Sequence, residues 1–202
     1  MMTKTDLLKR VPRRISRLLK GAVLCAVSGG LDSMCLLFAL DAWSREQGGR
    51  VIAAHFNHGL RGGLAGRDEQ FVRKICAEWG VSLTVGRGDV RGFAKRNGLS
   101  IEEAARDMRY GFLRRTAKAE GCSYICTAHH ADDNAETVLL NLVRGTGLRG
   151  LTGMEYRRDI ILRPLLDVTR AELEAYAAAW SIPHIEDETN ADPEAASRNL
   201  IR

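Results

Sequence analysis

Apolar runs alternate with longer mixed segments along most of the chain. Strand-like runs recur at four places: residues 21–27, 50–56, 81–85 and 123–128. Segments whose apolar residues follow helical spacing lie between and after them: 32–46, 67–79, 100–120 and 132–143. This alternation is typical of a parallel sheet that is covered on both sides. We therefore expect an α/β fold with a doubly wound, mostly parallel five-stranded sheet and helices on both faces.

The two ends of the chain depart from this alternation. Residues 1–20 hold seven basic residues against one acidic residue, and their apolar residues recur near helical spacing. We expect one amphipathic helix there, whose basic side either binds nucleic acid or is simply solvated. A glycine-rich basic loop is predicted at 144–150, a helix at 169–180 and an acidic, turn-rich stretch at 183–193.

Composition indicates a globular protein. The chain has 202 residues, of which 45% are hydrophobic, and a formal net charge of +5. No apolar stretch approaches the ~18 residues that a membrane span needs, and no signal-peptide core follows the basic start. We therefore expect a cytoplasmic protein with no membrane partner. An odd number of cysteines in apolar segments indicates buried, reduced thiols: Cys25, Cys35, Cys76, Cys122 and Cys126.

The most informative motif follows the first predicted strand: Ser28-Gly29-Gly30-Leu31-Asp32-Ser33. Two glycines let the backbone adopt conformations that a Cβ forbids, and the next helix turns its free N–H groups toward an anion. Asp32 would repel phosphates unless a divalent cation lies between them. The motif therefore predicts a site for a magnesium nucleotide, although it is not a Walker A loop. An ordinary strand-to-helix turn is the alternative.

Polar residues also follow the second and fourth predicted strands, at the sheet edge where doubly wound folds bind ligands. We expect His55, Asn57 and His58 either to bind the adenosine side of a nucleotide or to support the fold. Two arginines lie three apart in the predicted helix 100–120, where they either pair with carboxylates or phosphate or form a solvated face: Arg106 and Arg109.

The densest polar cluster spans residues 129–137, with the sequence His-His-Ala-Asp-Asp-Asn-Ala-Glu-Thr. Asp133 and Glu136 share one face of the predicted helix and can hold a cation, either magnesium or an ammonium group. Helix capping explains the two aspartates equally well. A zinc or manganese hydrolase centre built from the histidines and aspartates is a third possibility.

From Val23 onward, these motifs together resemble one family. They are S-G-G-L-D-S, H-F-N-H-G-L-R, E-E-A-A-R-D-M-R-Y, H-H-A-D-D-N-A-E-T, R-G-T-G-L-R-G-L, E-D-E-T-N-A-D and R-N-L-I-R. The set is similar to the N-terminal catalytic domain of the tRNA(Ile)-lysidine synthetase family. The first motif is shared by the wider N-type ATP pyrophosphatase, or PP-loop, group, and the block from H-H-A-D-D to G-L-R-G-L is much more specific.

The resemblance implies a Rossmann-like fold of the adenine nucleotide alpha hydrolase type. Residues 1–202 would be a single PP-loop ATP pyrophosphatase catalytic domain, with a nucleotide-binding core at 20–165. A C-terminal helix and an acidic turn segment would occupy 166–202. Family members continue into a helical region and often a further tRNA-binding domain, which we do not expect within residues 1–202. A homodimer is a further expectation.

The resemblance also implies a ligase that uses ATP and Mg²⁺. The cytosine C2 oxygen of the wobble cytidine in tRNA(Ile) with a CAU anticodon would be adenylated with loss of pyrophosphate. The amine of L-lysine would then displace AMP to give lysidine. Residues 28–33 would hold the pyrophosphate, and Asp32 would hold the metal.

Other roles follow from the same resemblance. Asp133 and Glu136 would orient the ammonium groups of lysine. Arg109 would contact the activated intermediate or lysine, and His129 would contact the reacting phosphate or the cytidine. Six arginines, with the basic first segment, would contact tRNA: Arg61, Arg106, Arg144, Arg149, Arg198 and Arg202.

Two other functions remain open at this point. A tRNA thiolase of the same group also adenylates a base but then delivers sulfur, and such enzymes usually carry C-x-x-C pairs. Here Cys122 and Cys126 are spaced C-x-x-x-C, with no second pair. The other alternative is a module that binds ATP or RNA without turnover.

Overall fold

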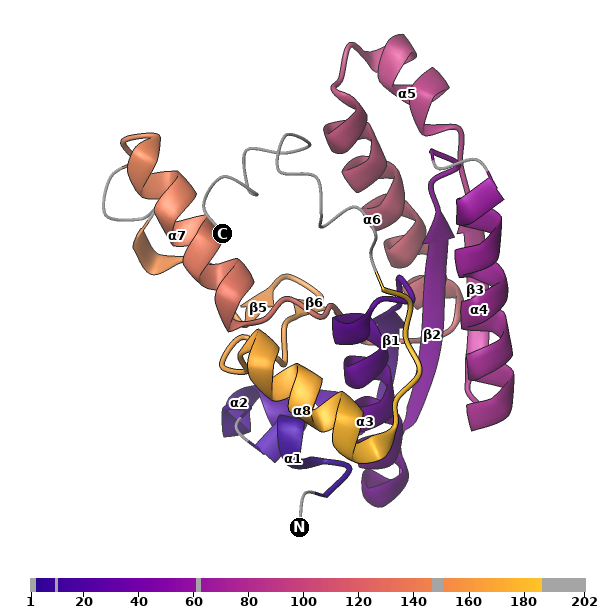
Figure 1. The fold of residues 1–202 in the computed structure, drawn as a ribbon, viewed down its shortest axis with the longest axis vertical. Helices are drawn as coiled ribbons and strands as arrows, with labels where there is room; N and C mark the ends of the chain where they lie inside the picture. The colour runs from indigo at the N-terminus through magenta and orange to yellow at the C-terminus, as the bar shows by residue number, and fades with distance from the viewer. Residues whose placement is uncertain (1–2, 10, 61–62, 147–150, 187–202) are drawn as a thin grey trace.

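A six-stranded sheet in the order β3-β2-β1-β4-β6-β5 forms the centre of the computed structural model (Figure 1). The structure describes residues 3–9, 11–60, 63–146 and 151–186. The strands are β1 (Ala22–Ala26), β2 (Arg50–Asn57), β3 (Ser82–Arg87), β4 (Tyr124–Cys126), β5 (Arg157–Arg158) and β6 (Ile161–Leu162). All neighbouring strands pair in parallel except β5 and β6, which are antiparallel.

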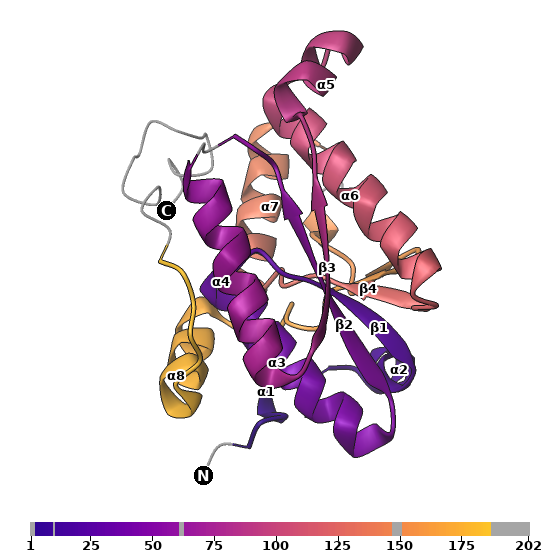
Figure 2. The ribbon, with the colours of Figure 1, turned by 90° about the vertical axis from the view of Figure 1, so that its right-hand side faces the viewer.

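Helices cover both faces of this sheet, as Figure 2 shows. Their bounds are α3 (Leu31–Gln47), α4 (Gly63–Trp79), α5 (Val90–Asn97), α6 (Ile101–Ala119), α7 (Ala131–Val143) and α8 (Arg170–Trp180). Alternate residues of β1 point to opposite faces. Val23 and Cys25 join the core formed with α3, α4 and α8, whereas Leu24 packs with side chains of α6. Burial on both faces explains why β1 is an uninterrupted apolar run.

The α/β class and the four long apolar runs are confirmed. The sheet has six strands, one more than the five expected, because β5 and β6 have two residues each and such short strands leave no sequence pattern. Helix α5 was not predicted either, since it buries only Val90 and Ala94. Its caps were a usable signal: Asp89 accepts a hydrogen bond from the Gly92 N–H, and Gly98 ends the helix in the left-handed conformation.

The expected single basic helix at the N-terminus is wrong. The described residues form three short turns instead: α1 (Asp6–Lys9), α2 (Arg13–Ser16) and the 3₁₀ helix η1 (Arg17–Lys20). Pro12 separates α1 from α2 because proline has no N–H and disfavours helix at the preceding residue. The apolar side does pack on the core, where Leu8 and Leu19 are fully buried.

The basic groups of this segment are partly used within the protein. The Lys4 ammonium lies 5.2 Å from the centre of the Phe38 ring and 5.5 Å from that of Trp180. Lys9 pairs with Asp6 at 2.6 Å. In the described part of the chain, no helix is both long enough and apolar enough to span a membrane.

A buried carboxylate on α4 connects this helix to the ends of β2 and β3. Glu69 accepts hydrogen bonds from Asn57 Nδ2 at 3.1 Å and from Arg73 Nε at 3.0 Å. Arg87 of β3 donates two more, at 2.9 and 2.7 Å. These bonds, above all the one from Arg87, lower the pKa of Glu69 to about 2. The ion cluster therefore fixes the end of β2 against α4 and β3.

Replacing Glu69 tests this cluster. Glu69→Gln should lower the free energy of unfolding by about 1–3 kcal/mol at neutral pH, because charge-assisted bonds to a buried group are lost. The pKa is lower in the folded protein than its ordinary 4.5. The stabilisation is therefore complete above that value and is lost as the pH falls toward 2. Urea unfolding at neutral pH and at about pH 3 measures the difference.

The matched control is Glu78→Gln on the same helix. Glu78 is exposed and lies 3.8 Å from Lys74, so its replacement should change stability by less than about 0.5 kcal/mol. An equal loss for Glu69→Gln at both pH values would contradict the role assigned to its charge.

Candidate active site

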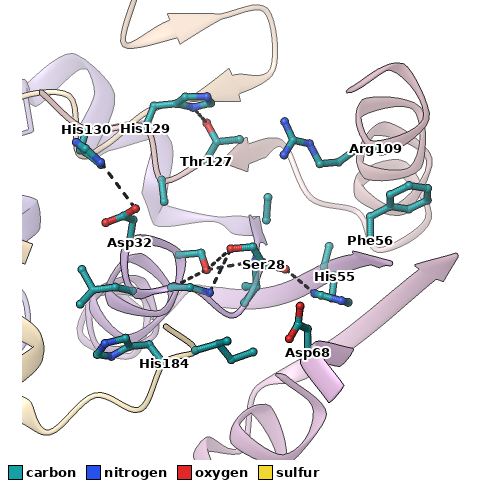
Figure 3. Close-up of a pocket in the computed structure, with 18 of the residues that line it drawn as sticks. Ser28, Asp32, His55, Phe56, Asp68, Arg109, Thr127, His129, His130 and His184 are labelled. Atoms are coloured by element: carbon teal, nitrogen blue, oxygen red, sulfur yellow. Dashed lines mark hydrogen bonds and ion pairs between the residues drawn. The ribbon is translucent and has the colours of Figure 1, made fainter. Parts of the chain in front are cut away.

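A cavity of about 1280 Å³ opens at the carboxyl ends of β1, β2 and β4. From β1 the sheet continues through β2 and β3 on one side and through β4 on the other. The strand order therefore reverses between β1 and β4. This reversal is the usual ligand position in doubly wound sheets. The walls come from the loop after β1, the end of β2, α6, the segment joining β4 to α7, and α8 (Figure 3). The volume is ample for a nucleotide.

The loop between β1 and α3 is held closed by Ser33. Its Oγ accepts from the backbone N–H groups of Ser28 and Gly29, both at 3.2 Å, and donates to the Gly30 carbonyl at 2.9 Å. The Ser28 Oγ lies 3.1 Å from the Ser33 Oγ. The two hydroxyls therefore shape the loop, and both residues also line the cavity.

The two glycines of the loop have different roles. Gly29 has φ +102°, and a Cβ there would stand 3.0 Å from the Ile185 side chain. Gly30 has φ −73°, a value open to any residue, so the expectation that both glycines need special backbone conformations holds for Gly29 alone. As the N-cap of α3, Gly30 has no side chain to bond the first-turn N–H groups, which leaves that helix end suited to an anion. Leu31, the next residue, is buried and lines the cavity.

A segment after α8 completes this loop. The Ile185 N–H donates to the Gly29 carbonyl at 2.9 Å, and Ile185 bridges to Gly30 as a short parallel pairing. No local pattern predicts this contact, because the two segments are more than 150 residues apart and Ile185 lies outside the predicted helices and strands.

Asp32 lies in the first turn of α3 at the cavity wall. Its two carboxylate oxygens are 2.9 and 3.1 Å from Nη1 of Arg170, which belongs to α8. Nε2 of His130 lies 3.7 Å from Oδ2 (Figure 3). Burial is the largest influence on the pKa of Asp32 and, with the charge of Asp133, raises it against the opposing effect of Arg170 and His130. The ionised form of Asp32 therefore depends on nearby positive charge.

The carboxylates suit magnesium brought in with a nucleotide. Mg²⁺ is usually held by one or two carboxylates together with substrate phosphates, and Asp32 and Asp133 line the same cavity as the loop. Among the residues that the structure describes, no three His, Cys, Asp or Glu side chains gather as a metal-binding group. The donor set thus fits a metal that phosphates help to hold.

The two adjacent histidines lie in opposite electrostatic surroundings. His130 is buried between carboxylates: Nδ1 is 3.4 Å from Asp132 and Nε2 is 3.5 Å from Asp133. His129 Nδ1 bonds the Thr127 hydroxyl at 2.9 Å. Burial, followed by the positive charges of Arg163, Arg109 and Arg106, lowers the pKa of His129 to about 3. His129 is therefore neutral, and the arginines around it disfavour the zinc or manganese centre considered from the sequence.

The carboxylates of α7 divide between two roles. Asp133 Oδ2 accepts from the His130 backbone N–H at 3.1 Å, so it caps α7 and also lines the cavity. Asp132 Oδ2 accepts from the Arg170 backbone N–H at 2.8 Å. Glu136 is half-buried one turn further along α7 and is not among the residues that line the cavity.

The arginines of α6 lie as their spacing predicts. Arg109 lines the cavity, and burial lowers its pKa. Its guanidinium is 5.4 Å from the centre of the Tyr110 ring, and that of the more exposed Arg106 is 4.8 Å from the same ring. Arg144 is exposed at the end of α7. Four of the arginines expected to contact tRNA lie outside the described residues: Arg61, Arg149, Arg198 and Arg202.

Side chains at the end of β2 both stabilise the fold and line the cavity. His55 is buried, its Nδ1–H donates to the Val27 carbonyl at 2.9 Å, and burial lowers its pKa. Asn57 bonds Glu69 and the Gly59 N–H, so its amide supports the fold. His58 packs edge-on against Phe56, with ring centres 5.0 Å apart. The cavity lining includes His55, Phe56, Asn57 and His58, and the Phe56 ring adds an aromatic surface that was not predicted.

The fold and this site define an α/β nucleotide-binding domain of the doubly wound class. A family model described as a PP-loop domain matches residues 4–202, and the chain belongs to this ATP-binding family. It is 43% identical over 180 residues to the tRNA(Ile)-lysidine synthase of Thermotoga maritima, covering 89% of this chain and 43% of the relative. For the same enzyme of Porphyromonas gingivalis, the identity is 46% over 181 residues, covering 89% of this chain and 39% of the relative.

The chain therefore spans about two fifths of the length of these relatives. Solved structures agree on the fold. The U34-tRNA thiolase NcsA of Methanococcus maripaludis, with its [4Fe-4S] cluster, matches with TM-score 0.77 and 19% identity over 98% of this chain and 69% of the other. The glutamine-dependent NAD⁺ synthetase of Acinetobacter baumannii matches with TM-score 0.56 and 16% identity, over 100% of this chain and 36% of the other.

The loop geometry predicts unequal effects of two alanine substitutions. Gly29→Ala should destabilise the protein by about 1–3 kcal/mol, because it forces a side chain into a positive φ and against Ile185. Gly30→Ala is the control: its Cβ would meet nothing closer than the Ser28 Oγ at 3.6 Å, so stability should change by less than about 1 kcal/mol. Thermal unfolding of both variants measures this, and equal losses would contradict the assignment.

Proposed function

We propose that this domain catalyses ATP-dependent ligation of L-lysine to C2 of the wobble cytidine in tRNA(Ile) with a CAU anticodon, giving lysidine, AMP and pyrophosphate. One observation carries the proposal: a single cavity joins the loop at residues 28–33 to Asp133 and Arg109. The reaction needs this continuity, because the activated base and the incoming amine must meet at one place. The 43–46% identity to the named synthases supports the same assignment.

In the first step the cytosine C2 oxygen attacks the α-phosphorus of ATP, and the bond to pyrophosphate breaks. The hydroxyls of Ser28 and Ser33 and the first-turn N–H groups of α3 bind the departing pyrophosphate. Asp32 holds Mg²⁺, which supplies charge neutralisation on the phosphates when bound. The end of β2, with His55, Asn57 and His58, lies beside the adenosine.

In the second step the lysine amine attacks C2, the bond between C2 and oxygen breaks, and AMP and a proton leave. Asp133 orients an ammonium group of lysine from the cavity wall, and Glu136 extends this acidic face along α7. Arg109 contacts the activated intermediate or lysine. His129 is neutral, so it acts as a hydrogen-bond partner of the phosphate or cytidine rather than as a cation.

The anionic tRNA is contacted by arginines outside the cavity and by the basic N-terminal segment. Arg106 and Arg144 are the described members of that group, and Arg61, Arg149, Arg198 and Arg202 complete it. Action on tRNA accords with the expected cytoplasmic location. Residues 1–202 act as one catalytic domain in this proposal, and a homodimer stays a prediction.

The cysteines favour ligation over thiolation. Every one of the five cysteines in the chain is buried and free of disulfides. Burial raises the pKa of the Cys76 thiol to about 11 and that of Cys35 to about 12. A thiolase needs thiolates that can carry sulfur or bind a cluster, and these thiols are protonated core groups.

The decisive assay combines the protein with ATP, magnesium, radiolabelled lysine and tRNA(Ile). Label in the tRNA together with pyrophosphate release is the expected result. Pyrophosphate release without label would indicate other adenylation chemistry, such as thiolation. If neither labelled tRNA nor pyrophosphate forms, the protein is a binding module and the proposal is overturned.

Asp32→Asn should lower pyrophosphate release at least about 100-fold, because it removes the charge that holds the metal beside the phosphates. Its thermal unfolding should stay close to that of the wild type, because burial disfavours the Asp32 charge and removing it offsets the lost bonds to Arg170. The control is Asp41→Asn on the same helix, where Asp41 pairs with the exposed Arg45 at 2.9 Å. Full activity of Asp32→Asn would remove Asp32 from the mechanism.

A further inference from the structure

Arg170 makes the closest charged contact with Asp32, and no sequence motif pointed to it. The two residues are 138 positions apart. A single nitrogen, Arg170 Nη1, lies within hydrogen-bond distance of both Asp32 oxygens, at 2.9 and 3.1 Å. Both residues line the cavity beside the loop at 28–33. The guanidinium therefore occupies the position next to Asp32 at which a cation is needed.

The rest of Arg170 is fixed by two acidic partners. Nε donates to Glu174 Oε1 at 3.0 Å, one turn further along α8. The backbone N–H donates to Asp132 Oδ2 at 2.8 Å, at the start of α7. Nearby, the Ala131 N–H bonds the Val168 carbonyl at 2.9 Å. The start of α8 is thus attached to the start of α7, and the Arg170 side chain extends from this junction toward α3.

The charges around this junction need a permanent cation. Asp32, Asp133 and Glu174 all line this part of the cavity, and bound ATP would add its phosphate charges beside them. A guanidinium stays protonated at every relevant pH and bonds carboxylate and phosphate oxygens equally well. Arg170 can therefore bond the Asp32 carboxylate when the cavity is empty and a phosphate when a nucleotide occupies it.

We propose that Arg170 is a phosphate-binding residue for ATP, held on Asp32 until the nucleotide arrives. The inference rests on the proposed function, because it takes ATP as the ligand. Magnesium on Asp32 would neutralise the carboxylate and repel the guanidinium, so the contact with Arg170 weakens when Mg²⁺-ATP binds. The freed N–H groups then donate to a phosphate oxygen, while Glu174 keeps the side chain at the cavity wall.

The test compares Arg170→Gln with the wild type in equilibrium binding of ATP and of adenosine, both with excess magnesium. The affinity for ATP should fall about tenfold to a hundredfold, as expected for loss of a charge-assisted bond. The affinity for adenosine, which has no phosphate, should stay within about twofold. An unchanged affinity for ATP, or equal losses for both ligands, would overturn the proposal.

Arg114→Gln is the matched control. Arg114 pairs with Asp159 at 2.6 Å, also between distant segments, and neither residue lines the cavity. This variant should bind ATP as the wild type does. If Arg170→Gln fails to fold, Arg170→Lys decides the question: it keeps a cation beside Asp32 but lacks the fork, so a loss of affinity confined to ATP supports the proposal and equal losses overturn it.

The same titrations separate this inference from the proposed function. A wild-type protein that does not bind ATP would remove the function itself. A wild type that binds ATP with the same affinity as Arg170→Gln would remove only the role of Arg170.

Discussion

The carboxylate of Asp32 sets the conditions for the whole site. It stands at the start of α3, partly withdrawn from water, and burial alone would favour its neutral form. Its charge persists because Arg170 from α8 and His130 before α7 approach it. Three segments far apart in the sequence must therefore meet at one point. The same arrangement places carboxylates beside a loop suited to phosphate. Because carboxylates and phosphates are both negatively charged, a cation is needed between them when a nucleotide binds.

The sheet makes that meeting possible. Because β1 lies between β2 and β4, the segments that follow these three strands meet at one edge of the sheet. Helices lie on both sides of β1 (Figure 2), and burial of its side chains on both faces fixes the start of the loop that follows. Gly29 then allows the sharp turn into α3 that a side chain would strain, and the Ile185 N–H bonds its carbonyl. Rigid strands thus position this loop and the start of α3 at the edge of the cavity.

The sequence pattern predicted those features that depend on residues close together in the chain. The β1 run, the loop at 28–33 and the helix expected at 100–120 all appear where the sequence placed them. The parts that were missed depend on distant contacts. Nothing near Arg170 indicates Asp32 as its partner, and two adjacent histidines give no reason to prefer His130 over His129 for that contact. Glu136 shares a helix face with Asp133, but the cavity wall includes only Asp133.

The most direct measurement is a crystal structure of the protein with magnesium and a non-hydrolysable ATP analogue. We expect the phosphates to lie at the loop from Ser28 to Ser33, the metal on Asp32, and the adenine toward His55 and Phe56. Phosphates bound elsewhere, for example in the separate hollow beside Glu69 and Arg87, or an analogue whose phosphates leave Asp32 without a metal, would contradict this expectation.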